Sequence, residues 1–168
     1  MEIKTITHKN ILLVENDPED LKLTLNALEE IHLGGKAMVV RNGEEALDYL
    51  CQRGAFKDRM GGDPVLILLD LKMPKVNGLE VLKILKADEH LKTIPVVMLT
   101  SSPELSDVTN CYRHGANAYV VKPMDITEFM TTVQRLGVFW TAVNEPPPQN
   151  GKAEIKHEIP PSHPLPGG

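Results

Sequence analysis

Polar residues follow four of the short apolar runs, and together they have the chemistry needed to hold a phosphoryl group. A carboxylate can accept a phosphoryl group only where nearby groups offset the incoming negative charge, and a divalent cation, a lysine or a hydroxyl can do so. Asp70 is the candidate acceptor, Lys122 the candidate cation and Thr100 the candidate hydroxyl. Glu15 and Asn16 can supply oxygen ligands to a metal ion such as Mg²⁺. Each residue alone is weak evidence, so the prediction depends on whether the fold brings them together.

Apolar runs alternate with amphipathic stretches along most of the chain, and this pattern predicts a fold that would bring these polar residues together. Asp17 is expected to cap the first helix, and Asp125 the last, which runs to about Val138. Strict alternation indicates a parallel sheet with helices on both faces, and ligands of such sheets bind beyond the carboxyl ends of the strands. The predicted strands are 11–14, 37–40, 65–69, 95–99 and 118–121, and the helices between and after them are 18–31, 44–50, 79–85, 103–114 and 125–138.

Charge and composition argue against several classes of protein. The net charge of -5 opposes nucleic-acid binding and docking on an anionic membrane. No apolar run approaches the roughly 20 residues of a membrane helix, and residues 1–10 lack the apolar core of a secretory signal. The two cysteines and six histidines show no zinc spacing, and we expect a cytoplasmic protein.

The C-terminal part of the chain differs in composition from the rest. Seven of the 13 prolines fall within residues 146–166, which is typical of an extended tail without its own core. We therefore expect one domain over residues 1–143 and a proline-rich tail over 144–168.

Residues 9–137 resemble the receiver domain of response regulators. The family's most specific motif is an aspartate followed by Met-Pro and then Gly, here Asp70, Met73-Pro74 and Gly78. The resemblance implies a doubly wound, flavodoxin-like (βα)5 fold with strand order 2-1-3-4-5. The matching segments are ILLVEND at 11–17, LILLDLKMPKVNGLEVL at 66–82, PVVMLTSS at 95–102 and AYVVKP at 118–123.

The same resemblance implies a role for each site residue. Asp70 would be the phosphoacceptor, and Thr100 a switch hydroxyl whose movement changes the rotamer of Tyr119. Lys122 would contact the phosphate, and the Lys122–Pro123 bond is expected to be cis. The implied ligands of a magnesium ion are Glu15, Asn16, Asp70 and the backbone carbonyl of Lys72.

A closer resemblance is to the phytochrome-associated response regulators, which are stand-alone receivers that take phosphate from a histidine kinase. It is carried by VENDPED at 14–20, the long loop 54–63 and VFWTAV at 138–143. These regulators share a C-terminal extension that helps to form a homodimer, so Phe139 and Trp140 are candidate dimer contacts. The alternative is that both rings cap the core of their own domain.

Two residues depart from the family pattern. Asn16 stands where the family usually has aspartate, so we expect weaker Mg²⁺ binding, by about 1–3 kcal/mol. Asp17 is better placed as a helix cap than as a replacement ligand. Lys72 lies two residues after the phosphoacceptor, where it would either slow or assist attack by water.

Three functions compete for this sequence. The favoured one is a non-enzymatic switch, in which phosphorylation of Asp70 repacks the surface of the fourth helix, fifth strand and fifth helix for a partner or a second copy. A phosphatase with a nucleophilic aspartate is disfavoured, because its usual second aspartate would stand at Lys72. The third is a phosphate-independent interaction domain, for which Asn16 is the best support. Residues 139–168 are too few and too proline-rich for a DNA-binding domain.

Overall fold

The computed structural model describes residues 9–149. Five strands in this range form one parallel sheet in the order β2-β1-β3-β4-β5. The predicted doubly wound α/β fold and its strand order are thereby confirmed. The strands are β1 (Ile11–Val14), β2 (Ala37–Val40), β3 (Leu66–Leu69), β4 (Val96–Thr100) and β5 (Ala118–Val121). The helices are α1 (Pro18–Glu30), α2 (Gly43–Leu50), α3 (Gly78–Ala87), α4 (Leu105–Arg113) and α5 (Ile126–Val138), with short turns η1 (Gly34–Lys36), η2 (Gly54–Phe56) and η3 (Phe139–Val143).

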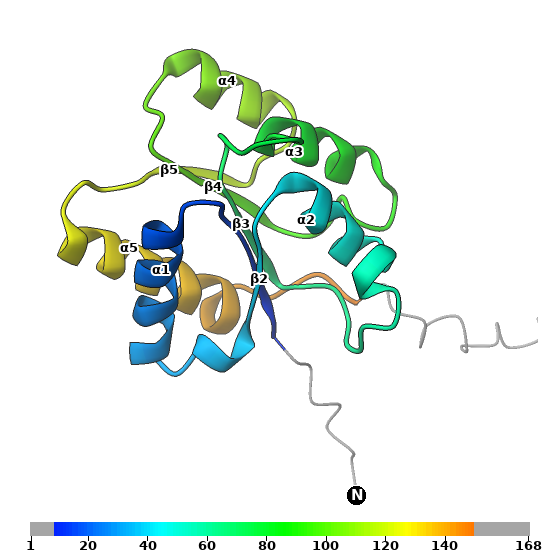
Figure 1. Cartoon of the computed structure of the whole chain (residues 1–168), viewed down its shortest axis with the longest axis horizontal. Helices are drawn as coiled ribbons and strands as arrows, with labels where there is room; N and C mark the ends of the chain where they lie inside the picture. The colour runs from blue at the N-terminus through cyan, green and yellow to red at the C-terminus, as the bar shows by residue number, and fades with distance from the viewer. Residues whose placement is uncertain (1–8, 150–168) are drawn as a thin grey trace, which may run out of the picture.

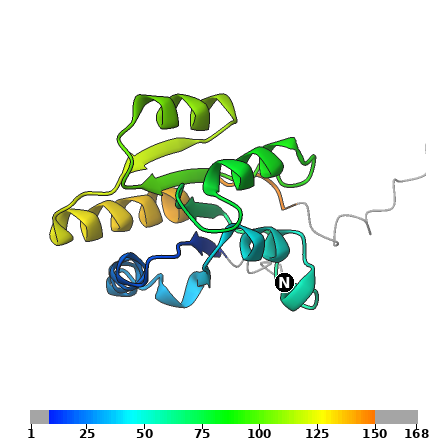
Figure 2. The ribbon, with the colours of Figure 1, turned by 45° about the horizontal axis from the view of Figure 1, so that its top comes forward.

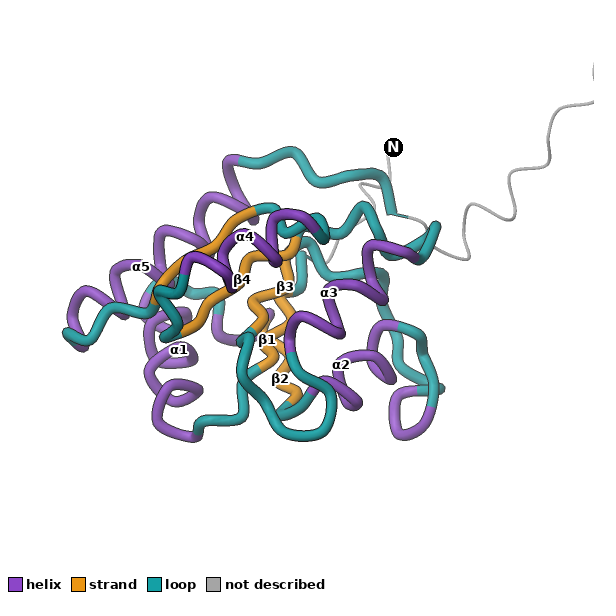
Figure 3. Tube along the Cα trace, turned by 90° about the horizontal axis from the view of Figure 1, so that it is seen from above, coloured by secondary structure: helices purple, strands orange, loops and turns teal. Residues whose placement is uncertain are grey.

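Helices cover both faces of the sheet, with α1 and α5 on one face and α2, α3 and α4 on the other (Figures 1 and 3). Successive residues of a strand point to opposite faces, so Leu13 packs with α1 and α5 while Leu12 packs with α2 and α3. Both sets are buried, which explains why β1 and β3 are apolar throughout and β4 is apolar as far as Leu99. Figure 2 shows α1 beside α5, a pair that joins the two ends of the domain.

Side-chain caps fix where α1, α2, α3 and α5 begin after the strands. The carboxylate of Asp17 accepts hydrogen bonds from the backbone N–H groups of Glu19 and Asp20, and Asp125 caps α5 in the same way. Both caps were predicted. Asn42 and Asn77 begin α2 and α3. The loops that carry the strand-end polar residues are therefore short and held at both ends.

Two local predictions were wrong. The Lys122–Pro123 bond is trans, as is every peptide bond within residues 9–149. The trans form of an X–Pro bond is favoured by about 0.5–1 kcal/mol, and the β5–α5 connection accommodates it. Helix α4 begins at Leu105 rather than near Pro103, because Glu104 keeps an extended backbone (φ -61°, ψ 127°).

Beyond α5 the helix widens into a π-turn, η3, closed by a hydrogen bond from the Asn144 N–H to the Phe139 carbonyl (2.6 Å). The Lys9 ammonium donates to the Thr141 carbonyl (2.6 Å), and the Asp63 N–H donates to the Gln149 side chain (2.8 Å). The predicted tail over 144–168 lies mostly outside the described residues, so its boundary stays a prediction. Within the described part, no helix is long and apolar enough to cross a membrane.

Candidate functional site

The polar residues that follow the strands meet at the carboxyl edge of the sheet. Val14 and Leu69 are register partners on β1 and β3, so Glu15 and Asp70 leave adjacent strands side by side. The Asp70 N–H donates to the Val14 carbonyl (3.0 Å), and the Lys122 N–H donates to the Thr100 carbonyl (2.8 Å). The strand pairing therefore continues into the site and holds the backbone of these residues.

The ammonium group of Lys122 lies among three carboxylates. Its Nζ is 2.7 Å from Glu15 Oε2, 2.8 Å from Asp20 Oδ2 and 3.6 Å from Asp70 Oδ2. The side chains of Lys122, Glu15 and Asp70 are only 8%, 9% and 9% exposed, whereas that of Asp20 is 33% exposed. The site is thus a buried, ion-paired cluster with one partner at its rim.

Burial and charge shift the pKa values of this cluster. Burial raises the pKa of Glu15 to about 7, with the neighbouring charge of Asp70 adding to the increase and the bond to Lys122 opposing it. Burial would lower the pKa of Lys122, but its hydrogen bonds to Asp20 and Glu15 and the charge of Asp70 raise it overall. Lys122 therefore stays cationic.

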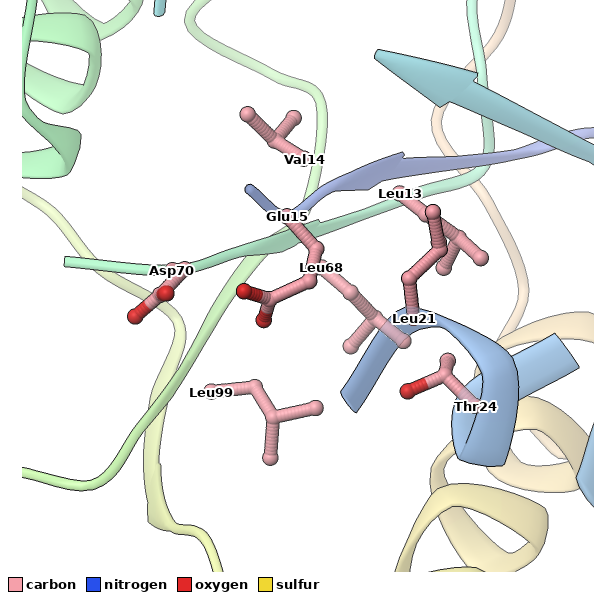
Figure 4. Close-up of a pocket in the computed structure, with 8 residues that line it drawn as sticks. All are labelled: Leu13, Val14, Glu15, Leu21, Thr24, Leu68, Asp70 and Leu99. Atoms are coloured by element: carbon pink, nitrogen blue, oxygen red, sulfur yellow. The ribbon is translucent and has the colours of Figure 1, made fainter. Parts of the chain in front are cut away.

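A small cavity lies beneath the two buried carboxylates, between the strands and α1. Figure 4 shows the carboxylates of Glu15 and Asp70 on the same side of their strands, with Thr24 facing them from α1. Its volume of about 10 Å³ has room for about one water molecule. The cavity is lined by Leu13, Val14, Glu15, Leu21, Thr24, Leu68, Asp70 and Leu99.

The predicted switch residues Thr100 and Tyr119 are joined through Ser102. Thr100 is buried and accepts a hydrogen bond from the Ser102 N–H (3.3 Å), while the Tyr119 hydroxyl donates to the Ser102 carbonyl (2.8 Å). The Ser102 hydroxyl donates to the carboxylate of Asp107 in the first turn of α4 (2.5 Å). One residue therefore contacts both predicted switch side chains and the start of a helix.

Asn16 and Lys72 lie at the exposed mouth of the site rather than inside the charged cluster. Both line an open hollow of about 550 Å³ between the β3–α3 loop and α4. No group of three or more His, Cys, Asp or Glu side chains within residues 9–149 is arranged to hold a metal ion. The structure thus brings Glu15 and Asp70 together with Lys122, and leaves Asn16 to the side.

Gly78, the last residue of the aspartate motif, has a structural reason to be glycine. A Cβ at this position would overlap the backbone carbonyl oxygen of Asp70. The Gly78 N–H also donates to the Leu71 carbonyl (2.8 Å). The start of α3 is therefore packed directly against the backbone of the candidate acceptor.

Sequence reasoning did not identify Asp20, Ser102 or Asp107 as part of this site. Only one weak indication pointed to Asp20, namely its position in the first turn of the helix that follows Glu15. Ser102 and Asp107 resemble ordinary loop and helix-start residues, and their contacts depend on the packing of α4.

The two candidate dimer residues differ in their surroundings. The Trp140 ring packs against the α1/α5 side of the core, as the alternative prediction had it. Phe139 is 46% exposed and meets Trp140 edge-to-face, with ring centroids 5.0 Å apart. Phe139 is thus the more exposed ring of this pair, and Trp140 is partly buried.

The fold and the buried Asp–Lys cluster define a receiver-type α/β domain, and comparison with known proteins agrees. The profile of the response regulator receiver domain matches residues 11–134, and the chain belongs to that family.

The chain is also similar to regulators of phytochrome kind. It is 36% identical over 132 residues to response regulator Rcp1 of Synechocystis sp., covering 79% of this chain and 88% of Rcp1. The structure of the phosphorylated cyanobacterial phytochrome response regulator RcpA is 36% identical with a TM-score of 0.78, covering 83% of this chain and 99% of RcpA. The bacteriophytochrome response regulator RtBRR is 56% identical with a TM-score of 0.67, covering 83% and 84% of the two chains. The predicted resemblance is thereby confirmed.

Proposed function

We propose that this chain accepts a phosphoryl group on Asp70 from a histidine kinase and thereby switches a surface that binds a partner or a second copy of itself. The observation that carries the proposal is the buried Asp70 carboxylate with the Lys122 ammonium 3.6 Å away at the end of the sheet. The family and the phosphorylated relative RcpA support it. The chain is then a signalling domain rather than an enzyme.

In the proposed transfer, a carboxylate oxygen of Asp70 forms a bond to phosphorus while the bond between phosphorus and the donor's imidazole nitrogen breaks. The imidazole leaves as a base and takes up a proton. Asp70 then carries about -1.5 to -2 charges, which Lys122 offsets as a cation. The Thr100 hydroxyl, already buried beside β5, is the donor proposed to turn toward the phosphoryl oxygens.

A divalent cation, Mg²⁺, is part of the proposal. Receiver relatives bind such ions, as shown by a Mn²⁺-bound structure of Rcp1, which is 35% identical with a TM-score of 0.77. The oxygen donors here fit such an ion in kind, since two buried carboxylates converge. Glu15 and Asp70 would hold it, with the Lys72 carbonyl and the Asn16 amide oxygen at the mouth. When bound, the ion would neutralise charge on the transferring group.

Intact-mass spectrometry tests the proposal directly. The protein is incubated with Mg²⁺ and acetyl phosphate beside the Asp70→Asn variant, with Glu89→Gln as a control for loss of an exposed acid far from the site. We expect the mass of one phosphoryl group to appear in wild type and in Glu89→Gln and to be absent from Asp70→Asn. A gain that persists in Asp70→Asn would place the phosphate elsewhere.

The proposed donor is a sensor histidine kinase of the phytochrome class, in the cytoplasm. This rests on the similarity to RcpA and RtBRR, which are named for phytochromes. Competition between candidate kinases for phosphotransfer to the purified chain is the matching test, and a non-phytochrome kinase that transfers faster would refute this part.

A homodimer that uses the η3 region completes the proposal. Val138, Phe139 and Val143 expose apolar side chains there, and exposed aromatic groups are frequent interface anchors. Trp140 would support Phe139 from below rather than contact the partner copy.

A second candidate, a phosphate-independent interaction domain, is favoured by one observation. Asn16 is uncharged and Asp17 is already used as the cap of α1, so the mouth of the site lacks its usual second acid. Absence of any mass gain at high Mg²⁺ would support this candidate.

A further inference from the structure

The resting position of Lys122 is set by a residue on a helix rather than by the strand-end residues alone. Of its two hydrogen-bonded carboxylates, Glu15 follows β1, but Asp20 belongs to the first turn of α1. The distance to Asp70 is 0.8 Å longer than that to Asp20 (3.6 minus 2.8 Å). Lys122 therefore leans toward α1, away from the candidate acceptor.

Asp20 is held firmly where it can do this. Its N–H is bound by the Asp17 carboxylate (3.0 Å), and its carbonyl accepts from the Thr24 hydroxyl (2.8 Å). With its backbone fixed at both ends, Asp20 can follow Lys122 only by a movement of its side chain or of α1 itself. Its carboxylate, one-third exposed, can also be solvated by water if Lys122 leaves.

We propose that Asp20 is a positioning residue that holds Lys122 against α1 in the unphosphorylated protein and competes with the phosphoryl group on Asp70 for it. Glu15 and Asp20 hold two of the three N–H donors of the ammonium at 2.7 and 2.8 Å, and in this position the Nζ is 3.6 Å from Asp70 and must move to bond closely to a group there. A phosphoryl group adds charge at Asp70 and draws the ammonium toward it. Capture of Lys122 by the phosphoryl group thus releases Asp20 and links phosphorylation to the start of α1. This inference rests on the proposed phosphorylation of Asp70.

The test is the affinity for beryllofluoride, a stable analogue of the phosphoryl group, in the presence of Mg²⁺. We expect Asp20→Asn to bind it more tightly than wild type, by about 5- to 20-fold, since a charge-assisted competitor has been removed. Glu19→Gln is the matched control, because it removes the same charge from the same turn of α1. Among the described residues the ion-pair partners of Lys122 are Glu15, Asp20 and Asp70, and Glu19 is not one of them. Equal tightening in both variants would overturn the inference, because it would show a general effect of charge.

A second readout requires no phosphoryl chemistry. The ¹⁵N resonance of the Lys122 ammonium in the unmodified protein should shift in Asp20→Asn and stay in place in Glu19→Gln, and in wild type it should shift when beryllofluoride binds. An unshifted resonance in Asp20→Asn overturns the inference even if Asp70 is phosphorylated normally. If Asp20→Asn shifts the Lys122 resonance but the protein takes up neither a phosphoryl group nor beryllofluoride, the competition and the proposed function are both refuted. The contact between Asp20 and Lys122 in the unmodified protein would then still stand.

Discussion

At the scale of single residues, the neighbours Asn16 and Asp17 differ in what their side chains can bind at the mouth of the site. Asp17 accepts the N–H groups of Glu19 and Asp20, which commits its carboxylate to α1. Asn16 offers only a neutral oxygen to a cation. We predict that Asn16→Asp raises Mg²⁺ affinity by about 5- to 150-fold, the factor that corresponds to about 1–3 kcal/mol. Titration followed by Trp140 fluorescence or calorimetry measures this.

The matched control is Asp17→Asn, which keeps a side chain able to cap α1. It should leave the Mg²⁺ affinity nearly unchanged. A similar affinity in wild type and Asn16→Asp would show that residue 16 does not contribute to the metal site.

The raised pKa of Glu15 predicts how stability depends on pH in metal-free protein. A carboxyl whose pKa rises from 4.5 to about 7 on folding favours the protonated form in the fold. Glu15 then contributes most to stability below pH 4.5, and this contribution is lost as pH rises through about 7. The unfolding free energy of Glu15→Gln relative to that of wild type should therefore increase by about 2–3 kcal/mol between pH 4.5 and pH 8. Urea unfolding at both pH values with a chelator present measures the difference, and a constant gap would contradict it.

At the scale of elements, the close approach of α3 to β3 depends on Gly78. Gly78→Ala would place a Cβ against the Asp70 carbonyl, so the start of α3 must move. We predict a loss of about 1–3 kcal/mol in unfolding free energy, measured by urea denaturation, together with slower phosphorylation. Gly35→Ala is the control, since nothing lies within 4 Å of its added Cβ. Equal stability of the two variants would refute the packing argument.

The connection between β4 and α4 depends on the bond between Ser102 and Asp107. Because this bond is partly buried and charge-assisted, we predict that Asp107→Ala destabilises the protein by about 1–3 kcal/mol. The double variant with Ser102→Ala should lose little more than either single variant, since both remove the same interaction. Unfolding free energies of the four proteins measure this. Strictly additive losses would show that the two side chains act separately.

Elements with a strong apolar pattern were predictable, and contacts between distant elements were not. The strand 118–121 and the caps Asp17 and Asp125 were found from the sequence, because local residue types determine them. The convergence of Glu15, Asp70, Thr100 and Lys122 followed from the rule that parallel strands share one carboxyl edge. The contact between Asp20 and Lys122 spans 102 residues and depends on how α1 packs beside α5, the helix that follows Lys122. No local pattern carries that information.

At the scale of the whole molecule, one edge of the sheet concentrates exposed apolar side chains. β5 is the edge strand of the sheet and is flanked by α4 and α5 (Figure 1). Its neighbour in the sheet is β4, which ends at Thr100. Hydrogen bonds through Ser102 join Thr100 to Tyr119 on this edge strand, and under the proposed function this connection would carry the effect of phosphorylation to the surface. The exposed apolar residues of this edge are Leu105, Tyr112, Val121, Met124 and Ile126.

The proposed homodimer is tested at the neighbouring η3 region. Phe139→Ser removes the exposed ring and leaves Trp140 in the core, so we predict that it shifts the mass in sedimentation from two chains to one without unfolding the domain. Met60→Ser is the control, because Met60 is equally apolar and more exposed but lies in the loop between η2 and β3. A single-chain mass for wild type at every concentration would refute the dimer. A dimer that survives Phe139→Ser but not Ile126→Ser would move the interface to the edge formed by α4, β5 and α5, where phosphorylation of Asp70 would then act on it directly.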